Sequence, residues 1–235
     1  MKLRSAALAA IGAVVLAGTL DPTGAAAAST ATGTVVALWN FDDAAGAPAA
    51  RDVSGNGHDA AIDARYSNVQ FGQTDSQVGT YAYVDMGLLR APSTPDLVPG
   101  SRDVTVTVQI RTTYSAGFSN FMQKGNYNNG RGFWKIEMSR NHARCRFTGD
   151  VATVGFETPT VINDGQWHTI TCHKTATYVE QFLDGVQTKR RNVAVGAITN
   201  TDDVAIGGKY AKAGGAVDPH DMLHGDINLA QYNLG

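Results

Sequence analysis

Oxygen-bearing side chains recur at close intervals in one short segment of the chain. The spacing of positions 1, 3, 5, 6 and 12 of a calcium-binding EF-hand loop is matched by Asp52, Ser54, Asn56, Gly57 and Asp63. Ca²⁺ prefers such hard oxygen ligands. However, the last position carries Asp where Glu is usual, and no helical pattern flanks the segment. A plain turn built on Asx side chains therefore stays open as the alternative.

A second group of residues has the composition of a sugar-binding site. Such sites use aromatic rings for stacking and amide or charged groups for the hydroxyls. The segment 126–133 combines these types, and Tyr114 lies in an earlier connection of similar composition. The candidate ligand-binding residues are Tyr127, Asn129, Arg131, Phe133, Gln109 and Arg111. Their alternative interpretation is as ordinary surface residues.

Two further patterns could carry chemistry, and both are weaker. The segment 218–224 contains two His and two Asp, which could bind zinc, but the spacing matches no zinc motif and the run includes a proline, which favours a solvated loop. The glutamates Glu137, Glu157 and Glu180 belong to different runs, although Glu137 could still meet Asp150 across strands. A retaining glycosidase needs two carboxyls about 5–5.5 Å apart. A hydrolase or lyase therefore remains an alternative without a supporting motif.

The elements that must position these residues read as β-strands. In 104–111 and 134–138 apolar and polar residues alternate, and the runs 166–172 and 178–183 adjoin turn signals such as Asp184-Gly185. Period-two alternation gives each strand one apolar face, which two antiparallel sheets can bury against each other. We therefore predict an all-β fold, a two-sheet antiparallel β-sandwich. Trp39 and Trp167 lie in period-two runs and are expected in its core, with a sugar-stacking position on the surface as the alternative.

Composition excludes some classes of partner. Hydrophobic residues make up 43% of the chain, enough for a real core, and charged residues only 17%. The formal net charge is −2, so the chain has no basic field with which to hold nucleic acid or an anionic membrane.

The first 28 residues have the pattern of a secretory signal peptide. Lys2 and Arg4 precede a short apolar run, and small residues follow at a possible cleavage site. Asp21-Pro22 interrupts the run before it reaches the ~20 residues that a membrane span requires. We expect a secreted, extracellular protein formed by residues 29–235, with no membrane span in the mature chain.

Two cysteines are present, Cys145 and Cys172, and each lies in a strand-like run. Export exposes them to an oxidising compartment, where a pair tends to form a disulfide. Two separate buried thiols remain the alternative, because strand placement does not fix the distance between them.

Several segments in succession resemble laminin-G-like domains of the concanavalin A-like lectin/glucanase superfamily. The resemblance rests on LWNFD (38–42), DVSGNG (52–57), MQKG (122–125), DGQWH (164–168), FLDG (182–185), AIGG (205–208) and GDI (225–227). It covers residues 34–233 and implies a jelly-roll, concanavalin A-like sandwich. The glucanases of this superfamily carry Glu-x-Asp-x-x-Glu, which this chain lacks.

The resemblance also implies a structural Ca²⁺. Its expected ligands are Asp42, Asn56, Asp226 and Asn228, which would join the first strand and the Gly-Asn turn to the last strand. Asn228 stands where many relatives have Asp, which lowers the expected affinity. We accordingly expect a non-catalytic, lectin-like module for a polysaccharide or surface glycan. A module that binds an extracellular protein is the further alternative.

Overall fold

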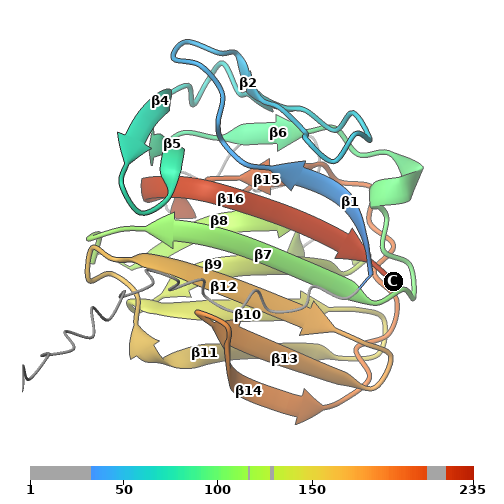
Figure 1. Cartoon of the computed structure of the whole chain (residues 1–235). Helices are drawn as coiled ribbons and strands as arrows, with labels where there is room; N and C mark the ends of the chain where they lie inside the picture. The colour runs from blue at the N-terminus through green and yellow to red at the C-terminus, as the bar shows by residue number, and fades with distance from the viewer. Residues whose placement is uncertain (1–32, 116, 128–129, 211–220) are drawn as a thin grey trace, which may run out of the picture.

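The computed structural model describes residues 33–115, 117–127, 130–210 and 221–235, which form a nearly all-β sandwich of two antiparallel sheets (Figure 1). This arrangement confirms the predicted fold class. The predicted signal peptide and Asn129 lie outside the described residues. None of the helices in the described ranges is long and apolar enough to cross a membrane.

Sheet A faces the viewer in Figure 1. Its strands follow the order β14 (Val186–Asn192), β13 (Tyr178–Leu183), β12 (Trp167–Lys174), β7 (Val104–Arg111), β16 (His224–Leu234), β5 (Gly79–Asp85) and β4 (Val69–Asp75), and β1 (Thr34–Trp39) also pairs with β16. First and last strands are thus neighbours, with Trp39 opposite Ala230.

Sheet B lies behind sheet A in the same view. Its strands follow the order β11 (Thr153–Val161), β10 (His142–Thr148), β9 (Phe133–Ser139), β8 (Phe118–Lys124), β15 (Val204–Ile206), β6 (Leu89–Ala91), β3 (Ala60–Ile62) and β2 (Ala49–Ala50). A short 3₁₀ helix, η1 (Pro95–Leu97), connects β6 to β7.

The predicted alternation is the reason the two sheets pack. On β7 the valines and Ile110 are fully buried between the sheets, whereas Gln109 and Arg111 project from the outer face of sheet A. On β9 of sheet B, the side chains of Trp134, Ile136 and Met138 are likewise fully buried between the sheets. Burial of these apolar side chains is the main contribution to stability, at about 25 cal/mol per Å².

A disulfide joins the two sheets through this core. Cys145 on β10 bonds to Cys172 on β12, with 5.6 Å between their Cα atoms. The predicted disulfide is confirmed. It links a strand of sheet B to a strand of sheet A, and the two strands are not paired through their backbones.

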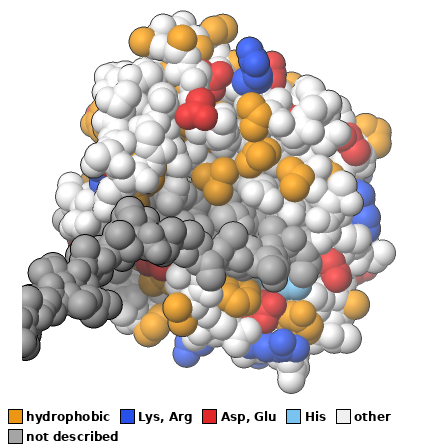
Figure 2. Space-filling model, viewed as in Figure 1, with side chains coloured by type: hydrophobic (Ala, Val, Ile, Leu, Met, Phe, Trp, Pro, Cys, Tyr) orange, Lys and Arg blue, Asp and Glu red, His pale blue; other side chains and the backbone are white. Residues whose placement is uncertain are grey.

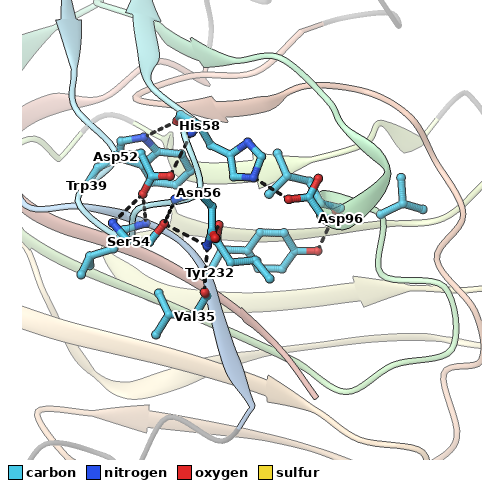
Figure 3. Close-up of polar contacts among 12 residues, drawn as sticks. Val35, Trp39, Asp52, Ser54, Asn56, His58, Asp96 and Tyr232 are labelled. Atoms are coloured by element: carbon cyan, nitrogen blue, oxygen red, sulfur yellow. Dashed lines mark hydrogen bonds and ion pairs between the residues drawn. The ribbon is translucent and has the colours of Figure 1, made fainter.

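The turn between β2 and β3 is anchored by one buried carboxylate, Asp52 (Figure 3). Its Oδ1 accepts hydrogen bonds from the backbone N–H of Leu38 (3.0 Å) and Ser54 (2.9 Å), and its Oδ2 accepts one from His58 (2.9 Å). The indole of Trp39 donates to the carbonyl of His58 at 2.8 Å. These bonds fix the turn against β1, and Trp39 lies in the core as predicted.

One buried cation gives the fold a testable dependence on pH. Lys124 is fully buried, and its Nζ donates to Ser93 Oγ (2.7 Å) and to the carbonyl of Asp202 (2.5 Å). Burial lowers the pKa of Lys124 to about 8. The unfolded chain releases the same proton near pH ~10.4. Between these values unfolding takes up a proton, so this residue makes the protein more stable as pH rises.

We therefore expect the free energy of unfolding to increase from pH 7.5 to pH 9.5, with roughly 2 kcal/mol of the increase due to Lys124. Burial lowers the pKa of Lys135 and Lys174 as well, so the wild-type slope contains all three. Urea unfolding of Lys124→Met at both pH values isolates the residue. Equal slopes in the variant and the wild type would contradict the expectation. Measurements stop at pH 9.5 because burial raises the pKa of Tyr210 to about 12, which acts in the opposite sense above pH ~10.

Candidate functional site

A pocket of about 450 Å³ opens where β7 ends and β16 begins, beside β5. These strand ends lie at the left of Figure 1. The residues that line it are Tyr83, Asp85, Arg111, Thr112, Thr113, Tyr114, Gly165, His224, Gly225 and Asp226, and we call it the Arg111 pocket. Its volume lies within the ~300–1,000 Å³ usual for small-molecule sites.

Arg111 is fixed in place by groups on three sides. Its Nε donates to Asp226 Oδ2 at 2.7 Å and its Nη1 to Asp75 Oδ2 at 2.6 Å. The guanidinium lies over the rings of Trp167 and Tyr81, 4.7 and 5.2 Å from their centroids. Strand register explains the arrangement, because Trp167 and Asp226 are the direct neighbours of Arg111 on β12 and β16.

The expectation that Trp167 lies in the core is wrong. Its side chain is half-buried on the outer face of sheet A, where it meets the edge of the Tyr81 ring at 5.4 Å. Alternation in the sequence does not show which of the two faces near the end of a strand points into the core. Trp167 lies directly opposite Arg111, so its side chain projects from the same outer face of sheet A.

His224 and Tyr114 form another wall of the pocket. Their rings stack with centroids 4.2 Å apart, and His224 Nδ1 lies 2.6 Å from Asp85 Oδ1. Thr112 Oγ1 donates to the carbonyl of His224 at 2.6 Å. The next residue must be glycine, because a Cβ on Gly225 would lie 2.4 Å from the carbonyl oxygen of Arg111.

The electrostatics of the pocket follow from burial. Burial raises the pKa of Asp226, although the Arg111 guanidinium acts against it. Burial also raises the pKa of Tyr83, and the carboxylates of Asp85 and Asp226 raise it further. At Asp75 the hydrogen bond from Gln77 and the contact with Arg111 lower the pKa. The pocket thus presents oxygen acceptors beside two tyrosine rings.

The structure divides the predicted ligand-binding residues between opposite faces. Arg111 lines the pocket, and Gln109 lies next to it on the same outer face of β7. On the other sheet, Tyr127 is 72% exposed and its ring meets the edge of Phe133 at 6.5 Å. Arg146 lies over both rings. Arg131 lies between β8 and β9, where its carbonyl accepts a hydrogen bond from the N–H of Thr199 at 2.9 Å.

The four predicted calcium ligands do not meet in one place. Asn56 Nδ2 donates to the carbonyls of Val35 and Val36 at 3.2 and 3.1 Å. Val35 lies opposite Asn233, which is seven residues from Asp226 on the same strand and hence about 23 Å away. The set therefore does not fit a single ion.

The individual calcium candidates have other contacts. Asp226 pairs with Arg111, and Asn228, at a bulge in β16, donates to Gln109 Oε1 at 2.7 Å. Asp42 is exposed and accepts a hydrogen bond from Asn40. Nor does the EF-hand spacing form a cation site, because backbone N–H groups face both oxygens of Asp52. Within the described ranges no cluster of three or more His, Cys, Asp or Glu side chains could hold a metal.

The weaker predicted patterns are also accounted for. Glu137 does not meet Asp150, since it pairs with Lys135 and lies 3.6 Å from Arg144, while Asp150 Oδ1 accepts from the N–H of Ala197 at 2.7 Å. In the proposed zinc loop, residues 218–220 lie outside the described part of the chain, and His224 faces the Arg111 pocket.

Comparison with known proteins identifies the family. The laminin-G-type model of the concanavalin A-like lectin/glucanases superfamily matches residues 78–228. This chain belongs to that superfamily. No curated protein matches the chain. The superfamily membership agrees with the sequence resemblance and with the observed jelly-roll sandwich.

Several solved structures are similar in fold at low sequence identity. Domain 4 of AbnA, an extracellular arabinanase from Geobacillus stearothermophilus in complex with arabinotriose, has a TM-score of 0.61 at 16% identity, over 86% of this chain and 93% of that one. The binding domain of Paraclostridial Mosquitocidal Protein 1 has a TM-score of 0.59 at 12% identity, over 86% of this chain and 48% of that one.

A botulinum neurotoxin gives a third example. The serotype D ligand binding domain, in complex with N-acetylneuraminic acid, has a TM-score of 0.57 at 11% identity, over 85% of this chain. The present chain spans about half the length of the mosquitocidal-protein and neurotoxin chains. At such identities the similarity establishes the fold and leaves the ligand open.

Proposed function

We propose that this protein is a secreted, non-catalytic carbohydrate-binding module that holds a polysaccharide or surface glycan in the Arg111 pocket. The observation that carries the proposal is the pairing of two tyrosine rings, Tyr83 and Tyr114, with fixed polar groups in one open pocket. Aromatic faces suit the apolar faces of sugar rings, and carboxylate oxygens suit their hydroxyls.

The rigidity of the site supports the proposal. Arg111 makes two short ion pairs and two ring contacts, and Tyr114 stacks on His224, so little side-chain freedom remains to be lost on binding. Two structural neighbours point the same way, since one is in complex with arabinotriose and another with N-acetylneuraminic acid.

The surface offers less support for a protein partner. Exposed large hydrophobic side chains such as Val53, Val151 and Val186 come from separate elements. Outside the grey atoms, Figure 2 shows the hydrophobic side chains of this face in small groups separated by other side chains and backbone. Protein-binding sites more often expose one continuous apolar patch.

The proposal is tested by a polysaccharide pull-down followed by calorimetry. The panel contains cellulose, chitin, xylan, arabinan and a soluble anionic polysaccharide. Calorimetry with oligosaccharides of the polysaccharide that binds best then gives the Kd. We expect Tyr114→Ala to weaken binding about tenfold, because an aromatic stacking contact contributes about 1–1.5 kcal/mol. Circular dichroism checks that the variant remains folded.

Tyr127→Ala is the matched control, since it removes an exposed tyrosine that follows β8 of sheet B and does not line the Arg111 pocket. We expect it to bind like the wild type. If Tyr127→Ala loses binding and Tyr114→Ala does not, the site lies on sheet B. If no saccharide in the panel binds, the proposed function is wrong.

A further inference from the structure

The Arg111 pocket carries an unbalanced set of charges. Two carboxylates, Asp75 and Asp226, pair with the single guanidinium of Arg111, and a third, Asp85, lines the same pocket. His224 adds only one more basic group, and it is paired with Asp85. Asp85 and Asp226 line the pocket directly, whereas Asp75 lies behind the arginine.

The guanidinium is already engaged and does not face a ligand as a free cation. Its Nε and Nη1 donate to two carboxylates, and Trp167 and Tyr81 cover its plane. An anionic sugar would have to displace one of these carboxylates or lie beside them. Like charges in such proximity oppose binding.

The potential at the pocket wall is negative. The carboxylates of Asp85 and Asp226 add to the effect of burial in raising the pKa of Tyr83, which lies two residues before Asp85 on β5 and directly opposite Asp226 on β16. At Asp226 the effect of Asp75 on the pKa is in the same direction, but the Arg111 guanidinium has the larger effect and opposes it. The carboxylates around Tyr83 therefore favour a positively charged group on that side of the pocket.

The geometry suits a group with several donors. Asp85 lies opposite His224 and Asp226 opposite Tyr83, so the two acids are diagonal neighbours, roughly 7–8 Å apart along adjacent strands. Asp85 contacts His224 through Oδ1, and Asp226 contacts Arg111 through Oδ2. The second oxygen of each carboxylate makes no hydrogen bond within the described part of the chain. An ammonium has three donors and no acceptor, which matches two such carboxylates.

We propose that the Arg111 pocket selects amine-bearing sugars, with the ammonium of the sugar between Asp85 and Asp226 and its ring against Tyr114. This inference rests on the proposed function and names its ligand class. A neutral sugar fits the pocket without the ammonium contact, and an acidic sugar is excluded.

The test compares three tetrasaccharides by calorimetry: glucosamine with free amines, N-acetylglucosamine, and galacturonate. The wild type should bind the free-amine tetramer at least tenfold more tightly than the acetylated one, and the galacturonate tetramer least. Asp85→Asn should reduce this preference to about twofold, because it removes one of the two carboxylates that face the ammonium. Asp85 is 40% exposed, so the substitution is compatible with folding.

Asp42→Asn is the control for net charge, because it removes one exposed carboxylate that does not line the pocket. It should retain the full preference. Equal affinity for the free-amine and acetylated tetramers, or tightest binding of galacturonate, would overturn the amine inference and leave the proposed function standing. Failure of every saccharide in both panels would overturn the two together.

Discussion

Replacing Asp52 by alanine is expected to lower the free energy of unfolding by about 3–5 kcal/mol. The substitution leaves the backbone N–H groups of Leu38, Ser54 and His58 without their acceptor. Each buried donor that loses its partner costs about 1–3 kcal/mol. Urea unfolding at pH 7 measures the change.

The pH dependence provides a second signature of Asp52. Burial alone would raise its pKa, but the hydrogen bonds from Ser54, His58 and Leu38 outweigh burial and hold the pKa below its usual value. The stabilisation is therefore present above the unfolded pKa of ~3.9 and is lost as the pH falls through the folded value. Asp42→Ala, which removes an exposed acid, should change stability by less than about 0.5 kcal/mol. Similar losses for the two variants would contradict the assigned role of Asp52.

Removing the disulfide should have an effect of similar size. Cys145 and Cys172 are separated by 27 residues, and closing such a loop stabilises the folded state by about 3–4 kcal/mol in the chain-entropy model. We expect the double variant Cys145→Ala/Cys172→Val to lose that amount in urea unfolding. A loss below about 1 kcal/mol would contradict it.

Reduction provides the internal control for this prediction. Dithiothreitol should destabilise the wild type toward the level of the double variant and leave the variant itself unchanged. An equal response of both proteins to the reductant would show that the effect does not come from the Cys145–Cys172 bond.

The strands that could be predicted are those with one apolar face in the core. Val104, Val106 and Val108 alternate with polar residues, and that pattern alone indicates a strand packed on one side. The Asp184-Gly185 turn indicates a hairpin, but the extent of the edge strand β14 is not readable from the sequence, because the segment 186–192 is almost entirely polar. Its charges, including Lys189 and Arg190, are typical of an edge that must not pair with another chain.

The candidate site was only partly readable from the sequence. The sequence identifies Arg111 as a polar residue on one face of a predicted strand. It identifies Tyr114 through the aromatic and amide residues of the connection that contains it. Asp85 and His224 are 139 residues apart in the chain, and only the pairing of β5 with β16 makes them neighbours. The alternation of Tyr81 and Tyr83 with Ala82 and Val84 was the signal that could have placed an aromatic face on β5.

The predicted calcium ligands show a different limit of sequence reasoning. A resemblance places Asn56 and Asp226 in the right segments, but it does not fix the distance between them. The register of β1 on β16 does so, and it separates the two residues by seven strand positions. Spacing within one strand is readable from sequence, whereas register between distant strands is not.

The most direct test of the account is a crystal structure of the protein with the oligosaccharide that binds best in the panel. The account predicts a sugar ring stacked on Tyr114 in the Arg111 pocket, with hydrogen bonds to Asp85 or Asp226. A sugar bound instead against Tyr127 and Phe133, on the outer face of sheet B, would contradict it.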